Sequence, residues 1–348
     1  MVLLSRLQLA KLVWDCQTSK ECYLMKVGIL AAGGIAHKMA KTLVGLNHAE
    51  IELYAVASRS LDKAKAFASE YSMPVAYGSY EELAQDDKVD LIYIASPHSE
   101  HHHHAMLCLK HKKALLVEKA FTANEQMAKD VLAFAKEQQT LVAEAIWTRY
   151  MPSRSIIAKA IDEGKIGKVH SIMANLGYAV AAKERIIKPE LAGGALLDLG
   201  VYPINFAMMF FGHDLASVSG TCIKADTGVD LMDSITLTWN DGKIACLHAT
   251  ANGPADRNGI IYGEKGYMVV TNINNPEKVE IFDNDHKLVE ELPLPKQVSG
   301  YEYQVISCLN ALKEGKLETP EMTHTEIIEV MQVMDSLRSD WGIKFPFE

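Results

Sequence analysis

Short apolar runs alternate with amphipathic segments over the first half of the chain. The runs occupy residues 26–30, 51–57, 90–95, 114–118 and 141–146. Each is nearly continuous in aliphatic residues, which is typical of parallel strands that are buried on both faces of a sheet. The segments between them are long enough for helices. The pattern over 25–147 therefore predicts an α/β domain, a doubly wound parallel sheet covered by helices.

Two short motifs predict where helices of this domain begin. Ser79 is followed three residues later by Glu82, and Thr122 is followed by Glu125. In such a capping box the hydroxyl and the carboxylate pair with backbone N–H groups that the first helical turn leaves free. We expect helices to start at both places.

The pattern changes after Pro152. It predicts a helix over 153–163 that ends at Gly164, a strand near 168–177, and a long helical stretch over 194–211 that closes at Gly212. Between about 215 and 292, alternating strands are separated by turn signals, which predicts an antiparallel meander. Two helices, 300–314 and 324–341, complete the chain. Residues 148–348 are therefore predicted to form an α+β substrate and dimerisation domain with a large, open, mainly antiparallel sheet.

Residues 1–24 stand apart from this organisation. Their apolar residues are interrupted by Arg6 and Lys11, and no small-residue cleavage site follows, so a secretory signal is not expected. The first strand begins abruptly at Met25. We expect Met25 to be the functional start and residues 1–24 to be an N-terminal extension, either a translated upstream segment or a dispensable helix.

Charge and cysteine usage exclude several classes of protein. The net charge of −9 argues against general affinity for nucleic acid or for anionic membranes. No uninterrupted apolar run approaches the roughly 20 residues that span a bilayer. The six cysteines are scattered without a paired spacing, which favours a reducing, cytoplasmic location.

A histidine run at 98 and 101–104 raises the question of a metal site. Consecutive helical residues point about 100° apart, so His101, His102, His103 and His104 cannot converge on one ion. His98, His101 and His102 could approach one another, but no carboxylate or cysteine arrangement completes a site. No metal is expected.

The segment AAGGIA at 31–36 follows the first strand and opens a helix. A dinucleotide-binding turn needs glycine at the tight turn and at the pyrophosphate contact, and a small residue where the helix packs on the strand. Gly33 and Ala36 take the second and third roles, whereas Ala31 replaces the first glycine. The position at the first strand–helix junction favours a Rossmann dinucleotide site over a plain glycine turn. The expected contact residues are Ala31, Gly33, Gly34, Ile35 and Ala36.

The second strand ends at Ser58 and Arg59, about twenty residues past Ala36. An enzyme that uses NAD normally has Asp or Glu there, which binds the ribose 2′-hydroxyl. A guanidinium beside a small hydroxyl instead suits a 2′-phosphate. We therefore expect NADP, with NAD possible. The alternative is an arginine that is simply solvated at a strand end.

Two places could supply a proton-transfer group. Glu118 and Lys119 lie at the carboxyl end of the fourth strand, the edge where open α/β sheets bind ligands. Asp198 and Tyr202 are four residues apart and share one helix face. A nearby ammonium would lower the pKa of the phenol, which would make Tyr202 a usable acid/base. Taken singly, Lys119 would be better explained as a solvated lysine and Tyr202 as a packing residue.

These residues belong to longer motifs that together resemble the Gfo/Idh/MocA oxidoreductases, the glucose–fructose oxidoreductase and inositol dehydrogenase type. The resemblance runs from Met25 to the C-terminus and is strongest to the branch of dimeric dihydrodiol and D-xylose dehydrogenases. The motifs are GILAAGGIA (28–36), YGSYEELAQD (77–86), VEKAFTAN (117–124), EAIWTRYMP (144–152), AGGALLDLGVYPINF (192–206) and the closing GIKFPFE.

The resemblance implies roles for individual residues. Lys119 corresponds to the catalytic lysine of a Glu-Lys-Pro motif, with Ala120 in place of proline, which leaves the placement of the lysine open. Asp198 and Gly200 match the helix motif, and Tyr202 stands where many members have histidine and the dihydrodiol branch has a tyrosine acid/base. The remaining implied residues are Trp147 and Arg149 in the active-site cleft, and Ser96, Pro97 and His101 on the cofactor side.

The sequence therefore predicts an enzyme that moves hydride between NADP and a hydroxyl-bearing carbon of a sugar or cyclic diol. The substrate pocket is expected to be formed by residues around 174–190 and 245–257. Alternatives are an enzyme of the same family that uses NAD on a sugar or inositol, and a non-catalytic NADP-binding regulator. We expect a homodimer or homotetramer formed through the C-terminal sheet.

Overall fold

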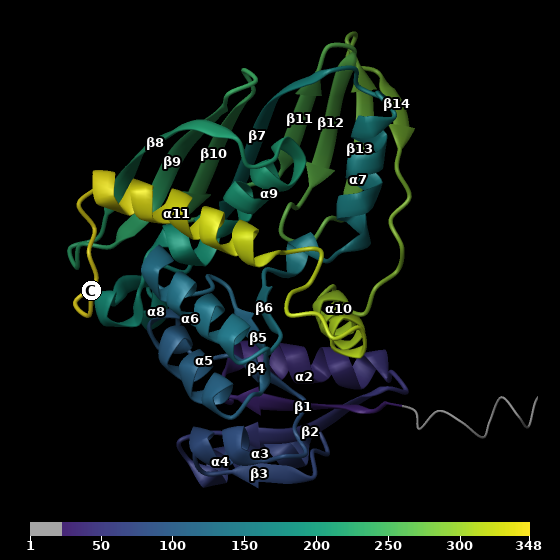
Figure 1. The fold of residues 1–348 in the computed structure, drawn as a ribbon. Coiled ribbons are helices and arrows are strands. Elements are labelled where there is room, and N and C mark those ends of the chain that lie inside the picture. The colour runs from purple at the N-terminus through teal and green to yellow at the C-terminus, as the bar shows by residue number, and fades with distance from the viewer. Residues whose placement is uncertain (1–22) are drawn as a thin grey trace, which may run out of the picture.

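The computed structural model describes residues 23–348, and the expectations for residues 1–22 lie outside this range. Two sheets organise the described chain (Figure 1). A six-stranded sheet with helices on both sides forms the first domain, and an eight-stranded sheet forms the second. This confirms the predicted fold class.

The first sheet is entirely parallel, with the strand order β3-β2-β1-β4-β5-β6. Five of its strands are those predicted from apolar runs. The sixth, β3, has only three half-buried residues at the sheet edge and therefore leaves no apolar run in the sequence. The strands are β1 (Met25–Leu30), β2 (Ile51–Ala57), β3 (Val75–Tyr77), β4 (Leu91–Ile94), β5 (Ala114–Glu118) and β6 (Val142–Ala145).

The helices of this domain follow the strands in sequence. They are α2 (Gly34–Leu46), α3 (Leu61–Glu70), α4 (Tyr80–Gln85), α5 (His101–Lys110) and α6 (Glu125–Glu137). A late segment of the chain returns to this domain: α10 (Glu302–Lys313) packs against α2. Its Val305, Cys308 and Leu309 belong to the same buried cluster as the apolar residues of β1 and α2.

One of the two predicted capping boxes is confirmed. Ser79 accepts a hydrogen bond from the backbone N–H of Glu82, whose carboxylate accepts from the N–H of Ser79. The box predicted at Thr122 is wrong. Asn124 caps α6 instead, because its side chain lies immediately before the helix and accepts from the N–H of Met127 at 2.9 Å. The Thr122 hydroxyl donates to the carbonyl of Asn124.

The second sheet has the strand order β14-β13-β12-β11-β7-β10-β9-β8. All its pairs are antiparallel except β7 with β10, so the predicted meander is incomplete. The earlier strand β7 enters between β10 and β11, a pairing that the alternation of residues within one strand cannot reveal. The strands are β7 (Val169–Gly177), β8 (Leu215–Lys224), β9 (Asp230–Trp239), β10 (Ile244–Thr250), β11 (Gly259–Gly263), β12 (Gly266–Thr271), β13 (Lys278–Asp283) and β14 (Leu288–Glu291).

Helices cover one face of this sheet (Figure 1). α9 (Val201–Phe211) lies against β7 and β10, and α11 (His324–Asp340) packs on α9 and β8. The predicted helix over 194–211 begins as a π-helical turn, Leu196–Gly200, and continues as α9. Of residues 23–348, Pro189–Phe211 is long and apolar enough to span a membrane, but 89% of its apolar 18-residue window is buried inside the protein. The remaining helices are α7 (Pro152–Asp162) and the short α8 (Glu184–Ile187).

Candidate active site

A cavity of about 500 Å³ lies between the two domains, at the carboxyl ends of β1, β4 and β5. Open parallel sheets bind ligands at this edge. Eight residues predicted from the sequence line it: Gly34, Ile35, Ser96, Pro97, Glu118, Lys119, Asp198 and Tyr202. The structure therefore brings together the glycine turn, the end of the fourth strand and the Asp198–Tyr202 helix.

The glycine turn leaves room for a ligand. Gly33 caps the N-terminus of α2, and a Cβ added at Gly33 or Gly34 would meet no atom of residues 23–348 within 4 Å. A helix N-terminus presents unpaired N–H groups and a positive dipole, which suit a pyrophosphate. Ala36 is fully buried, as expected where the helix packs on the sheet. These residues fit a dinucleotide.

Ala31 departs from the usual fingerprint, and the structure gives it φ 77°. This left-handed conformation favours glycine, so the alanine adopts it at a cost of about 1–2 kcal/mol. The backbone therefore keeps the tight turn although the sequence lacks the glycine. Its N–H donates to the carbonyl of Ala57 at 3.0 Å, which ties the turn to the end of β2.

Arg59 lies exposed at the end of β2 and has no acidic partner within salt-bridge distance among residues 23–348. The buried Ser58 precedes it, and its hydroxyl accepts from the N–H of Ser60. Two acids could compete for the ribose: Glu52 lies at the opposite end of the strand, and Asp62 lies in the first turn of α3 without an ion pair to Arg59. The guanidinium is therefore available to a 2′-phosphate.

Asp198 is held between two cations. Lys119 donates from Nζ to the backbone oxygen of Asp198 at 2.6 Å and to its Oδ1 at 3.2 Å, and Arg185 donates to Oδ2 at 2.6 Å. Burial by itself would raise the pKa of Asp198, but the charges of Lys119 and Arg185 outweigh it and hold the pKa well below its usual range. Asp198 is therefore a carboxylate that orients Lys119.

Tyr202 contacts Lys119 in another way than the sequence predicts. The Nζ of Lys119 lies 5.1 Å from the centre of the phenol ring, and the hydroxyl accepts from Nε1 of Trp147 at 3.1 Å. Burial and the negative charge of Glu118 raise the pKa of Tyr202 well above its ordinary value. The predicted lowering of this pKa is therefore wrong for the protein without ligands, because the ammonium faces the ring and Asp198 rather than the hydroxyl.

Two buried carboxyl groups lie under the turn that carries Asp198. Asp230 accepts from the backbone N–H of Leu196 at 2.5 Å, which caps this helical turn. Gly194, at φ 123°, is required there because a Cβ would collide with the Asp230 carboxylate. Burial and the neighbouring Asp230 raise the pKa of Asp233 well above its usual range, which favours a proton shared between the two carboxyl groups.

The histidines near the cavity bind backbone carbonyls. His101 is fully buried, and its ring nitrogens lie 2.9 Å from the carbonyls of Ser96 and Ala120. His98 lies between the carbonyls of Ala192 and Lys119, and burial lowers its pKa to about 3, so it is neutral. The Lys119–Ala120 peptide bond is cis. Residues 23–348 contain no group of three His, Cys, Asp or Glu side chains arranged to hold a metal.

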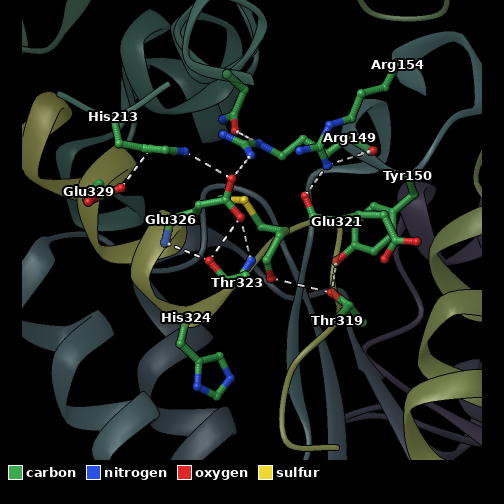
Figure 2. A network of polar contacts seen from close by, with 12 residues as sticks. Arg149, Tyr150, Arg154, His213, Thr319, Glu321, Thr323, His324, Glu326 and Glu329 are labelled. Atoms are coloured by element: carbon green, nitrogen blue, oxygen red, sulfur yellow. Dashed lines mark hydrogen bonds and ion pairs between the residues drawn. The ribbon is translucent and has the colours of Figure 1, made fainter. Parts of the chain in front are cut away.

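The structure separates Trp147 and Arg149, which the sequence placed together in the cleft. Trp147 stacks on Tyr301 with ring centres 4.2 Å apart and holds the Tyr202 hydroxyl. Neither side chain lines the cavity itself, but Trp147 contacts two residues that do, whereas Arg149 contacts none. The Arg149 side chain is fully buried and pairs with Glu326 at 2.6 Å, in a polar network on the side of α11 (Figure 2).

Several lining residues were not found from the sequence. Lys38 lies four residues after Gly34 on the same helix face, a spacing that could have indicated it. Of the two predicted pocket segments, 174–190 contributes lining residues between 178 and 185. The segment 245–257 contributes none, because β10 runs beneath the helical turn at Leu196–Gly200. The other lining residues are His98, Tyr178, Val180, Lys183, Arg185, Leu191, Leu199, Asn274 and Tyr301.

Known proteins resemble this chain over nearly their whole length. Trans-1,2-dihydrobenzene-1,2-diol dehydrogenase from Xenopus tropicalis is 31% identical over 327 residues, which cover 92% of this chain and 99% of the relative. The enzyme of that name from Homo sapiens is 29% identical over 328 residues, which cover 92% of this chain and 98% of the relative. The 3-ketoreductase KijD10 from Actinomadura kijaniata, crystallised with NADP and TDP-benzene, has a TM-score of 0.82 at 25% identity, covering 91% of this chain and 97% of the other.

Family models match both halves of the chain. Residues 25–145 match the oxidoreductase family with an NAD-binding Rossmann fold, and residues 156–269 match the GFO/IDH/MocA C-terminal domain. Levoglucosan dehydrogenase shares the fold, with a TM-score of 0.80 at 16% identity. The chain therefore belongs to the GFO/IDH/MocA family of oxidoreductases and is an NAD(P)-dependent enzyme acting on CH–OH groups.

Proposed function

We propose that this protein is an NADP-preferring dehydrogenase or reductase that transfers hydride to or from a hydroxyl-bearing carbon of a sugar or cyclic diol. The observation that carries the proposal is the arrangement of Lys119, Asp198 and Tyr202 around one cavity that begins at the glycine turn. A binding protein without turnover has no need of a buried ammonium–carboxylate pair next to a phenol at its ligand cavity. The relatives named for dihydrodiol oxidation and for ketoreduction support this class of reaction.

In this proposal Tyr202 transfers the proton. Its oxygen accepts from Trp147, so its own hydrogen is left to point into the cavity that it lines. Because its pKa is raised, the phenol stays protonated and is ready to donate to a developing alkoxide during reduction. Lys119 places a positive charge beside the reacting oxygen, and Asp198 fixes that charge.

The glycine turn and the end of β2 would hold the cofactor. A bound nicotinamide supplies or accepts the hydride. Gly33 and Gly34 leave space for the pyrophosphate, and the exposed Arg59, without an acidic partner among residues 23–348, suits the 2′-phosphate of NADP. The ketoreductase KijD10 was crystallised with NADP, which agrees with this preference.

The proposed function is tested by following nicotinamide absorbance at 340 nm with aldoses, inositols and cyclic diols, each with NADP and with NAD. We expect turnover with at least one hydroxylated substrate and faster turnover with NADP. Turnover with NAD alone on a sugar or inositol would favour the alternative enzyme. Tight NADP binding without turnover on any of these compounds would favour a regulator.

We further propose that the protein is cytoplasmic and oligomeric through its second sheet. Burial raises the pKa of Cys108 to about 12, and the four described cysteines are unpaired thiols, which suits a reducing compartment. No helix of residues 23–348 covers the sheet face opposite α9, and Met173 and Ile244 are exposed on two neighbouring inner strands, β7 and β10. An apolar face of this kind is typical of a subunit interface.

A further inference from the structure

The short turn Trp147–Arg149 connects the active site to a buried ion pair. At one end, the indole of Trp147 donates to the Tyr202 hydroxyl at 3.1 Å and stacks on Tyr301 at an interplanar angle of 11°. At the other end, Arg149 points away from the cavity and is among the largest fully buried side chains of the described chain. A displacement of this turn would therefore move Trp147 relative to Tyr202.

Arg149 binds the helix that carries Tyr202. Its Nε donates to Oδ1 of Asn205 at 2.6 Å, and Nδ2 of Asn205 donates to the carbonyl of Val201 at 2.8 Å. Asn205 lies three residues after Tyr202 on α9, about one helical turn away. Trp147 and Arg149 thus make two contacts between the same turn and the same helix, one at the active site and one behind it.

The counter-charge of Arg149 is itself fixed in position (Figure 2). Glu326 accepts from Nη1 of Arg149 at 2.6 Å and lies 3.1 Å from Nε2 of His213 through the same oxygen. Its other oxygen accepts from the N–H and the hydroxyl of Thr323, the capping box that begins α11. The guanidinium is therefore anchored to α11 by a carboxylate that His213 and Thr323 also hold in place.

This geometry excludes direct contact between Arg149 and a ligand in the cavity, because its side chain has no exposed surface. Stability alone also does not explain the Arg149–Glu326 ion pair, because replacing both partners of a buried ion pair by apolar side chains often costs little stability. The planar guanidinium instead fixes the orientation of the Trp147–Arg149 turn, because two of its nitrogens donate to partners on different helices. Catalytic groups lose effectiveness when they move by as little as about 1 Å.

We infer that Arg149 is a positioning residue, which ties the Trp147–Arg149 turn to α9 and α11 and so keeps the Trp147 indole on the Tyr202 hydroxyl. The inference rests on the proposed function, in which Tyr202 transfers the proton. Trp147 occupies one lone pair of the phenol oxygen and thereby directs its hydrogen into the cavity. Without Arg149 we expect the phenol to rotate among several partners.

The experiment is a mutant cycle measured by kcat. A single indole–phenol hydrogen bond is worth roughly fivefold to tenfold in an equilibrium or rate, so Trp147→Phe and Arg149→Met should each lower kcat by about that factor. The double variant should lose no more than either single one, because both remove the same restraint. In a Tyr202→Phe background both substitutions should have almost no further effect. Arg149→Lys, which keeps the charge but not the two-bond geometry, should restore little of the loss.

The matched control is Arg338→Met. Arg338 is another buried arginine and lies on α11. It pairs with Asp335 and Glu348 at 2.9 Å, and it does not contact the Trp147–Arg149 turn. It should lower the melting temperature without changing kcat. If Arg149→Met does not fold, Asn205→Ala takes its place in the cycle, because it removes the contact to α9 alone.

Two outcomes would overturn the inference. One is an Arg149→Met or Asn205→Ala protein with a lower melting temperature but unchanged kcat, as in the control. The other is a loss of kcat that adds fully to that of Trp147→Phe, or that persists in the Tyr202→Phe background. Near-normal turnover of Tyr202→Phe itself would instead contradict the proposed role of Tyr202, so the two failures are distinguishable.

Discussion

The ammonium group of Lys119 lies over the ring of Tyr202, 5.1 Å from its centre, and its hydrogen bonds go to Asp198. The two side chains therefore share one wall of the cavity while the phenol hydroxyl is held by Trp147. We expect Lys119→Ala and Tyr202→Phe each to lower kcat by about 100-fold or more, the range of a lost general acid or base. Steady-state kinetics and a cofactor-binding titration measure both effects.

Because Lys119 and Tyr202 act on the same reacting oxygen, their contributions should not add. The double variant should be only slightly slower than the worse single variant. Cofactor affinity should change little in Tyr202→Phe, since the phenol oxygen has its partner in Trp147. Losses that multiply fully would show that the two groups act in separate steps.

The outer face of the second sheet should hold the subunits together. Met173, 52% exposed, lies on β7 directly opposite Cys246 of β10, at the centre of the sheet. We expect Met173→Lys to shift the protein to a smaller species in analytical ultracentrifugation, because it buries a charge in the proposed interface. Leu288→Lys is the control: Leu288 is 53% exposed but lies on the edge strand β14, so the mass should not change. A parent protein that is already monomeric would contradict the proposed assembly.

The features that the sequence predicted well are those determined locally. The glycine turn, the end of β5 and the Asp198–Tyr202 spacing each depend on residues within a few positions of one another. The parallel strands place the first two at one sheet edge, and the second domain places the third against it. The capping box at Ser79 is of the same kind. Such features follow from strand and helix periodicity alone.

The features that the sequence did not reveal depend on distant partners. Arg149 belongs to a cleft motif, but its bonds go to Asn205 and Glu326, which are 56 and 177 residues away. Arg185 reaches Asp198 only because the short helix α8 turns back over the cavity. The sequence correctly predicted that Lys119 lies near Tyr202. The effect of Lys119 on the pKa of Tyr202 depends, however, on whether its ammonium faces the ring or the hydroxyl. Pairings of this length are set by the tertiary fold.

Arg59 should decide the choice of cofactor. It is exposed at the end of β2 and has no acidic partner among residues 23–348, and a charge-assisted hydrogen bond to a 2′-phosphate is worth about 1.5–3 kcal/mol. We therefore expect kcat/KM to be at least about tenfold higher with NADP than with NAD. Arg59→Ala should remove most of that preference and leave the use of NAD almost unchanged, because NAD has no phosphate to lose.

The measurement is kcat/KM with both cofactors in the parent and in Arg59→Ala. Lys63→Ala is a suitable control, since Lys63 is an exposed cation on the first turn of α3, four residues after Arg59. The Lys63→Ala substitution should lower kcat/KM only slightly, and to the same extent with both cofactors. Equal use of NAD and NADP by the parent would mean that Arg59 does not contact the ribose.

The carboxyl pair under the catalytic turn should make stability depend on pH. Burial and the charge of Asp230 raise the pKa of Asp233 well above its ordinary value, so the folded protein keeps a proton that the unfolded chain releases near pH 4. The stabilisation from this proton is fully present below about pH 4. It is lost progressively as pH rises from there through the folded pKa, because over that range the folded state binds more protons than the unfolded state.

Asp233→Asn tests this directly, because the amide can donate to Asp230 without releasing a proton. Buried acids outside this pair, such as Glu144, whose pKa burial raises to about 8, contribute equally to the pH dependence of parent and variant and cancel in the comparison. We expect the melting temperature of the variant, relative to the parent, to rise as pH increases from 4 to 8. The variant should also keep the Asp230–Leu196 cap and hence normal kcat. Melting curves that shift in parallel over this range would mean that Asp233 does not hold the proton.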